Sequence, residues 1–187
     1  RRALLLEDNQ VDSCVGDGMF FENWGMLPFR VRRNTITNSY KGIQFYQTRG
    51  VVVENNVITG SEYYGIYLAS LAPAYDQAYT FKNNVLTLNN GGLYASALYY
   101  YRQSLNLVNN TISHGRGDQY DAYLYDWSTL DSTQLTIEQS TSTAAWNLYV
   151  RSIYGGPSYP SYFHQARFNE TRILNCSGAT SGNMYWE

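Results

Sequence analysis

The sequence predicts an all-β solenoid of about seven stacked units, and three observations support that prediction. An apolar-x-apolar-x-x-Asn-x-apolar pattern recurs along the 187 residues. A second pattern follows most copies, in which a small or polar residue precedes apolar-x-apolar. In both patterns apolar residues alternate with a period of two, which indicates strands rather than helices. One structural unit therefore repeats along most of the chain.

The first pattern is clearest at residues 105–112, where Asn110 occupies the asparagine position. Five copies carry asparagine there, and two weaker copies carry threonine. The seven predicted ladder positions are Asn9, Asn34, Asn56, Asn84, Asn110, Thr133 and Thr171. The steps between them are 25, 22, 28, 26, 23 and 38 residues. Periods of this size are typical of solenoids, in which each unit contacts only its neighbours.

Each unit should direct alternate strand residues into the solenoid, since successive side chains of a strand point to opposite faces. We expect the asparagine to turn the chain, because it tolerates the left-handed conformation that a sharp bend requires. Stacked asparagine amides can also hydrogen-bond from one unit to the next. The second pattern then supplies the last strand, and the residues preceding that strand are Gly18, Gly42, Gly65, Gly92, Asp121, Asn147 and Asn183.

Leucine-rich repeats share the asparagine pattern at 20–29 residues. Their second half, however, is helical or a leucine-rich extended turn, whereas this chain has strand-like segments such as residues 42–45. The sequence instead resembles the right-handed parallel β-helix repeat family, of the pectate-lyase-like superfamily, over most of its length. The resemblance implies a single right-handed parallel β-helix of about seven rungs.

We see no domain boundary, so residues 1–187 are predicted to form one β-helix domain. Neither the first nor the last unit shows an amphipathic helical cap, which natural solenoids usually need. The chain is therefore expected to be a segment of a longer solenoid or a subunit that assembles through its ends. Four segments vary between units and form the expected loops, at residues 69–78, 96–104, 113–120 and 151–165.

Composition argues against several functional classes. The net charge is −2 and the pI about 5.7, which gives no electrostatic basis for binding nucleic acid. No apolar run approaches the roughly 20 residues of a membrane span. The chain lacks zinc-ligand spacing and a phosphate-binding loop, so no cofactor is expected. Calcium would suit a β-helix lyase, but no motif in the chain supports it.

The two cysteines are predicted to be buried free thiols. Cys14 and Cys176 occupy equivalent positions in the first and seventh units. At the strand spacing of about 4.8 Å, six steps separate them by roughly 29 Å. A disulfide needs Cα atoms within about 7 Å, so the two thiols of one chain cannot pair.

The strongest functional signal is the outward residue of the last strand, which is aromatic in six of seven units. These residues are Phe20, Gln44, Tyr67, Tyr94, Tyr123, Tyr149 and Tyr185. In pectate-lyase-like proteins the outer face of this strand commonly forms the floor of a polysaccharide groove. The resemblance thus implies glycan contact, since flat aromatic surfaces suit sugar rings. The alternative is a structural role, in which stacked aromatics stabilise the face or pack laterally against another copy.

One polar cluster could support catalysis. The fifth unit carries His114, Arg116, Asp118, Asp121 and Asp126, which could supply a general acid or base beside the aromatic face. The alternative is an ordinary solvated loop. The motifs of polygalacturonases, the mannuronan epimerase Asp-Pro-His-Asp and the acidic calcium cluster of pectate lyases have no counterpart here.

Two functional classes therefore remain. The first is an extracellular structural or adhesive solenoid whose tyrosine-rich face packs laterally or contacts glycans. The second is a polysaccharide-active enzyme, either a lyase, a glycoside hydrolase or an epimerase, that uses the same face. Its partners would be polysaccharide or copies of itself, arranged head-to-tail or laterally. The acceptor sequences at Asn109, Asn169 and Asn175 mildly favour a secreted protein.

Overall fold

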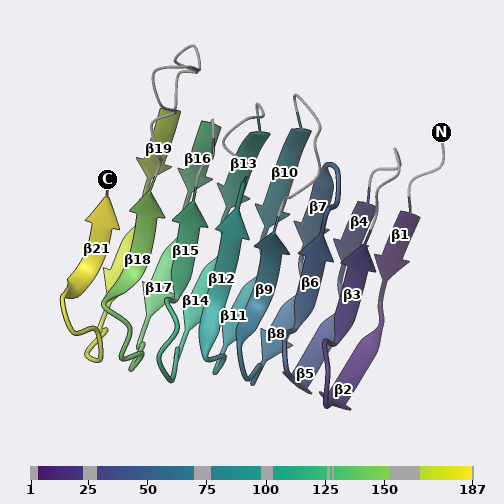
Figure 1. Cartoon of the computed structure of the whole chain (residues 1–187), viewed down its shortest axis with the longest axis horizontal. Helices are drawn as coiled ribbons and strands as arrows, with labels where there is room; N and C mark the ends of the chain where they lie inside the picture. Colours follow the sequence, from purple (N-terminus) through teal and green to yellow (C-terminus); the bar gives the residue numbers. More distant parts are fainter. Residues whose placement is uncertain are drawn as a thin grey trace.

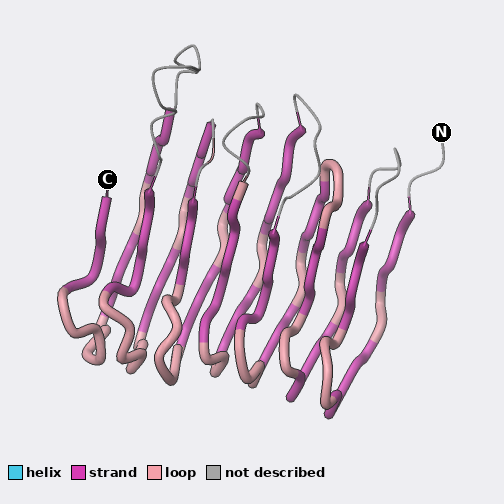
Figure 2. The backbone as a smooth tube through the Cα atoms, in the orientation of Figure 1, coloured by secondary structure: helices cyan, strands magenta, loops and turns pink. Residues whose placement is uncertain are grey.

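The computed structural model describes residues 4–22, 29–69, 77–97, 103–125, 127, 129–151 and 165–186. Within these ranges the chain consists of strands and turns that wind into a solenoid (Figures 1 and 2). The strands form three parallel sheets of seven strands each, which we call sheets A, B and C. One coil contains a strand from each sheet, so coil 1 comprises β1–β3 and coil 7 comprises β19–β21. The predicted all-β parallel solenoid is confirmed.

Sheet A holds the strand that precedes the asparagine turn. Its strands are β1 (Leu4–Glu7), β4 (Phe29–Arg32), β7 (Val51–Glu54), β10 (Gln77–Lys82), β13 (Gln103–Val108), β16 (Thr129–Thr133) and β19 (Gln165–Asn169). Sheet B follows that turn. Its strands are β2 (Gln10–Cys14), β5 (Thr35–Ser39), β8 (Val57–Thr59), β11 (Val85–Thr87), β14 (Thr111–Ser113), β17 (Thr136–Glu138) and β20 (Arg172–Leu174).

Sheet C carries the second sequence pattern. Its strands are β3 (Met19–Glu22), β6 (Ile43–Tyr46), β9 (Tyr64–Ala69), β12 (Gly91–Ser96), β15 (Ala122–Tyr125), β18 (Trp146–Arg151) and β21 (Gly182–Trp186). Alternate residues of all three sheets fill one continuous apolar core. The inward side chains of sheet B are packed closely against those of the neighbouring coils. Ile36, Ile58 and Ile137, for example, have no exposed surface. Burial of each such side chain stabilises the folded state by roughly 1.5–3 kcal/mol.

The predicted asparagine ladder is present between sheets A and B. Asn34 Nδ2 donates a 3.0 Å hydrogen bond to Asn56 Oδ1. Asn56 in turn donates to Asn84 over 3.0 Å, and Asn84 donates to Asn110 over 3.0 Å. The peptide N–H of each of these donors also points at the next Oδ1. Each coil is thus hydrogen-bonded to the next through a buried amide, which would be costly to leave unpaired.

Two details of the predicted ladder are wrong. The left-handed residue is the one before the ladder position, with φ between 50° and 59° at Asp8, Arg33, Asn55, Asn83, Asn109, Gln134 and Glu170. Because that residue makes the turn, the ladder side chain is free to reach the next coil. In coil 6, Thr133 pairs with Val108 at the end of β16, so the ladder position is Leu135 instead. A buried leucine ends the amide series there.

The predicted row of small or polar residues at the start of the sheet C strands is present, and we call it the glycine row. Four of its members are the second residue of their strand and do not precede it, namely Gly65, Gly92, Asn147 and Asn183. Gly92 illustrates the requirement, since a Cβ there would lie 2.5 Å from Ile112 Cγ2 and 2.6 Å from the Asp121 carbonyl oxygen. Sequence analysis missed a second left-handed row, at the turn from sheet B to sheet C. Its non-glycine members are Ser13, Asn38, Leu88, His114, Gln139 and Asn175.

Both cysteines are free thiols, as predicted. The prediction that they are buried is wrong in degree, because both are only partly buried. They lie on the outermost coils, where no further coil of the described structure covers them. Burial raises the pKa of the Cys176 thiol above its ordinary value. Among the described residues, none forms a helix with the length and hydropathy of a membrane span.

Candidate functional site

The outward residues of sheet C form a single row along the solenoid. The strand register places Phe20 opposite Gln44, Gln44 opposite Tyr67, and Tyr67 opposite Tyr94. The row continues through Tyr123 and Tyr149 to Tyr185. We call its last five members, Tyr67, Tyr94, Tyr123, Tyr149 and Tyr185, the tyrosine row. Period-two alternation was sufficient to locate it.

The five rings of the tyrosine row stack face to face. Ring centroids are 4.5 Å apart between Tyr67 and Tyr94, and 5.0 Å apart between Tyr94 and Tyr123. The next two steps are 4.9 Å and 5.0 Å, and the interplanar angles along the row lie between 2° and 12°. Each inner ring therefore has both faces covered. Ring edges and phenol hydroxyls are what remain for a ligand to contact.

Two phenols of the tyrosine row, Tyr67 and Tyr123, have raised pKa values. The pKa of Tyr67 is raised to about 12, chiefly by burial and then by the neighbouring phenols Tyr94 and Tyr63. Burial likewise raises the pKa of Tyr123, followed by the influence of Tyr94 and Tyr149. These two phenols consequently keep their protons at neutral pH and can both donate and accept hydrogen bonds.

Other tyrosines support the row from the side. The Tyr120 ring lies 5.4 Å from Tyr123 and 5.2 Å from Tyr149. On the same flank two coils earlier, buried Tyr64 makes an edge contact with Tyr94 at 5.5 Å. Such aromatic pairs each contribute about 0.5–1.5 kcal/mol beyond area burial. The row is therefore held rigidly rather than presented on a loose surface.

A lysine closes the end of the tyrosine row towards coil 1. Lys41 Nζ lies 5.1 Å from the Tyr67 ring centre and 5.0 Å from that of Tyr40. It also donates a 2.6 Å hydrogen bond to Gln44 Oε1 and lies 3.7 Å from Asp17 Oδ1. The ammonium group is thus held by cation–π contacts and a carboxylate. Sequence analysis did not detect this arrangement, because its members come from two turns and two strands.

The candidate catalytic residues of coil 5 lie in different environments. His114 is exposed and takes a left-handed turn conformation with φ 54°. Arg116 is exposed, and so is Asp118, whose Oδ1 accepts a 3.0 Å hydrogen bond from Gln119 Nε2. Asp121 is fully buried. Asp126 lies outside the described residues, and a catalytic role for the set stays a prediction.

Asp121 occupies the glycine row, where a carboxylate fits because Gly115 leaves it room. A Cβ on Gly115 would lie 1.9 Å from Asp121 Oδ1. Asn147 Nδ2 donates a 2.7 Å hydrogen bond to Asp121 Oδ2. Burial raises the pKa of the Asp121 carboxyl, and hydrogen bonds from Ser140 and Asn147 oppose the shift. With no exposed surface, the side chain contributes to the interior of the coil.

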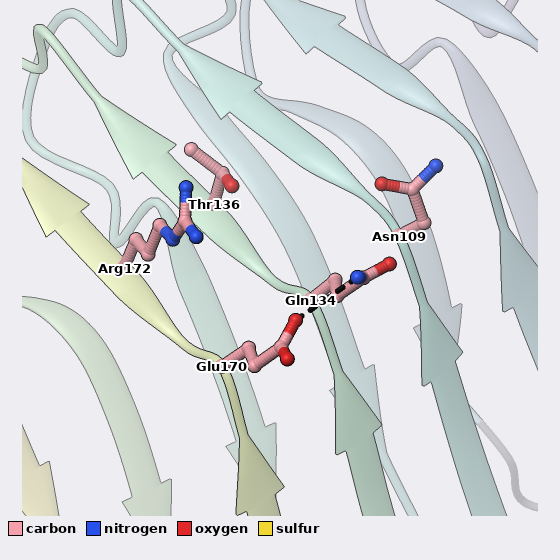
Figure 3. A pocket seen from close by; sticks show the side chains of 5 residues that line it. All are labelled: Asn109, Gln134, Thr136, Glu170 and Arg172. Carbon is pink, nitrogen blue, oxygen red and sulfur yellow. Dashed lines mark hydrogen bonds between the residues drawn. The ribbon is translucent and has the colours of Figure 1, made fainter.

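A polar hollow lies at the turn between sheets A and B in coils 5 to 7 (Figure 3). Its lining residues are Asn109, Gln134, Thr136, Glu170 and Arg172. Gln134 Nε2 donates a 2.9 Å hydrogen bond to Glu170 Oε2 across it. The hollow lies away from the outer face of sheet C, and the sequence did not reveal it. No three His, Cys, Asp or Glu side chains gather around a possible metal position in the described part of the chain.

Comparison with known proteins agrees with this architecture. The family model described as "Right handed beta helix region" matches residues 2–142, about three quarters of the chain. Searches of curated proteins and of solved structures found no match. The repeat, the three parallel sheets and the family match lead to one conclusion: the chain belongs to the right-handed β-helix family.

Proposed function

We propose that the chain is a structural or adhesive β-solenoid whose tyrosine row is its contact face. The observation that supports this most strongly is the uninterrupted stack of five rings at 4.5–5.0 Å. The stack spans coils 3 to 7 and is flanked by further tyrosines. It offers a linear and rigid surface of ring edges and hydroxyls, which suits an extended polysaccharide or the side of another solenoid.

The burial and hydrogen bonding of the nearby acidic side chains favour a contact role over a catalytic one. General acid–base chemistry needs a group within hydrogen-bond reach of the substrate. Asp121 has no exposed surface and accepts a hydrogen bond from Asn147, while Asp118 accepts hydrogen bonds from Gln119 and from Asn90 of the preceding coil. A polysaccharide lying along the tyrosine row would instead meet hydroxyls that can donate to its oxygens. Tyrosine is well suited to such surfaces, since it combines a rigid ring with a polar edge.

An extracellular or cell-surface location belongs to this proposal. The family resemblance to pectate-lyase-like proteins supports it. So do the exposed asparagines of the acceptor sequences, Asn109, Asn169 and Asn175. A polysaccharide or a second solenoid outside the cell is the partner class that such a surface would encounter. Calcium could take part through the exposed carboxylates, although no residue set singles it out.

Binding to a polysaccharide panel tests the proposal. The wild type would be sedimented with insoluble polysaccharides and run through gels containing soluble neutral and acidic ones. The Y94L/Y123L variant removes two stacked rings, and Y94F/Y123F removes only their hydroxyls. We expect the leucine variant to lose retention and the phenylalanine variant to lose less. T59A/T87A on the outer face of sheet B is the matched control and should bind like the wild type.

The same samples address lateral packing and catalysis. If the tyrosine row packs against other copies, light scattering should show large wild-type particles that Y94L/Y123L abolishes. Release of reducing ends or unsaturated products would instead favour a polysaccharide-active enzyme. The proposal is contradicted if the wild type neither binds nor associates, or if the leucine variant behaves like the wild type in both assays.

A further inference from the structure

The acceptor sequence at residues 109–111 places its asparagine on the surface of coil 5. Asn109 is exposed and makes the turn from β13 to β14 in the left-handed conformation, with φ 50°. Coils 4 and 6 pair with its coil on both sides. The exposure of Asn109 is therefore a property of the side of the solenoid and does not depend on how the chain continues beyond either end.

The acceptor pattern selects this exposed asparagine and not the buried one beside it. The pattern needs a serine or threonine two residues after the asparagine, and Thr111 supplies it for Asn109. For Asn110 that position is occupied by Ile112, which lies in the core. The other buried ladder asparagines are excluded in the same way, because the residues at that distance are inward-facing, namely Ile36, Ile58 and Leu86. A sugar on Asn109 thus leaves the ladder intact.

The Asn109 amide retains a hydrogen that a glycosidic bond can replace. Its Nδ2 carries two hydrogens, and among the described residues it donates one hydrogen bond, over 3.0 Å to Asn83 Oδ1. Figure 3 shows this side chain among those that line the polar hollow, together with Gln134 and Thr136 of coil 6. A sugar joined to Nδ2 would meet polar surface groups, and no core side chain would have to move.

Coil 3 has the same turn without the acceptor hydroxyl. Asn55 is exposed with φ 58°, and its Oδ1 accepts a 3.0 Å hydrogen bond from Asn83 Nδ2. Two residues later comes Val57, which is exposed and lies in the same strand row as Val85 and Thr111. The turns of coils 3 and 5 therefore differ in the residue that the acceptor pattern requires, and coil 3 offers a matched control.

We infer that Asn109 is an N-glycosylation site of this chain. The inference rests on the extracellular location in the proposed function, because the donor sugar is met during export. That donor is an oligosaccharide joined through pyrophosphate to a membrane lipid. Asn109 Nδ2 forms a bond to C1 of the first sugar, the bond from C1 to the phosphate oxygen breaks, the lipid pyrophosphate leaves, and Nδ2 gives up one proton.

A glycan at Asn109 would determine which side of the solenoid stays accessible. Asn109 lies at the turn between sheets A and B, away from the outer face of sheet C. A bulky, soluble glycan there keeps a neighbouring solenoid off this turn. The tyrosine row stays open for contact.

Secretion from a eukaryotic host tests the site. The full chain would be expressed behind a cleavable secretion signal and treated with peptide N-glycosidase in heavy-oxygen water, which marks each glycan-bearing asparagine for peptide mass spectrometry. The wild type should carry the mark at Asn109. T111V keeps the asparagine and should lose the mark there, whereas T111S should retain it. V57T completes the acceptor pattern in coil 3 and should gain a mark at Asn55.

An unmarked Asn109 in secreted wild-type protein would overturn the inference, and so would a mark at Asn109 that persists in T111V. Peptide mapping separates this site from the acceptor sequences at residues 169 and 175, and circular dichroism checks that the variants keep the β-solenoid spectrum. Translation in the presence of microsomes gives the same readout for any variant that is retained in the cell. Polysaccharide binding by the tyrosine row is measured on protein without glycans, so the proposed function and this inference can fail separately.

Discussion

At the residue scale, the glycines before sheet C are needed for space. Gly92 lies where Ile112 and the Asp121 carbonyl leave no room for a Cβ, whereas Gly16 has nothing within 4 Å of that position. We predict that Gly92→Ala lowers the free energy of unfolding by about 1–3 kcal/mol, the usual cost of overpacking. Gly16→Ala is the matched control and should change it by under about 0.5 kcal/mol. Urea unfolding of both variants measures the difference, and equal midpoints would contradict this account.

The buried carboxyl of Asp121 should make stability depend on pH. Its pKa in the folded chain is raised above the ordinary value of 3.8, so the folded state holds the proton more tightly than the unfolded state. Its contribution to stability therefore falls as the pH rises from below 3.8 through the raised pKa. We predict that Asp121→Asn removes this fall. Urea unfolding of both proteins from about pH 3 to pH 8 gives the difference, which should grow in favour of the variant with pH.

Exposed acids whose pKa is lowered make stability rise with pH, which is opposite to the effect of Asp121. Comparing the wild type with Asp121→Asn cancels this contribution, because both proteins carry these acids. The pKa of Glu7 is lowered chiefly by its hydrogen bond to Arg32, and that of Asp8 by Arg33. These groups are unchanged in the Asp121→Asn variant. A difference that is constant across the series would show that Asp121 titrates normally in the folded chain.

Residue-scale prediction from the sequence succeeded where period-two alternation decides the outcome. It placed Tyr94 and Tyr123 in one outward row and Gly92 at the strand entrance, both as found. It failed for the left-handed positions, because Arg33 and Leu88 have no intrinsic preference for that conformation. Only the winding of the coils requires it there.

At the element scale, the asparagine ladder joins the turns of successive coils. Asn84 Oδ1 accepts from both the peptide N–H and Nδ2 of Asn56, and Asn84 Nδ2 donates to the Val53 carbonyl. We predict that Asn84→Ala lowers the free energy of unfolding by about 2–4 kcal/mol, since buried donors lose their acceptor. Thermal or urea unfolding measures this.

Asn83 provides the control for that substitution. It lies beside Asn84 with φ 54°, a conformation that glycine adopts freely, and its side-chain bonds are to exposed Asn55 and Asn109. Asn83→Gly should therefore change stability by under about 0.5 kcal/mol. Similar losses in both variants would mean that burial of the ladder amide is not what matters.

The extent of the ladder could be predicted from the sequence except in coil 6. There the chain has Thr133 near the expected position, but β16 runs to Thr133 and places Leu135 in the ladder. A fully buried leucine can replace the amide because it joins the core. The sequence around Leu135 contains no motif that marks the replacement of asparagine by leucine. Only the strand register reveals that Leu135 holds the ladder position.

At the scale of the whole molecule, stacking alone aligns residues that are 22 to 36 positions apart into continuous rows. The sequence period was enough to predict seven coils and the aromatic face. It could not predict that the tyrosine rings cover one another's faces, because ring orientation depends on neighbours such as Tyr64 and Tyr120. It also missed the polar hollow, whose residues come from three coils.

The measurement that tests the central claim most directly is hydroxyl-radical footprinting of the tyrosine row. The wild type would be oxidised free and when bound to the insoluble polysaccharide that retains it best, or when self-associated. We predict that oxidation of Tyr94, Tyr123 and Tyr149 falls on contact, while that of Val57 and Val85 on the outer face of sheet B stays unchanged. Unchanged tyrosine oxidation in the bound state, or protection confined to sheet B, would contradict the claim that the tyrosine row is the contact face.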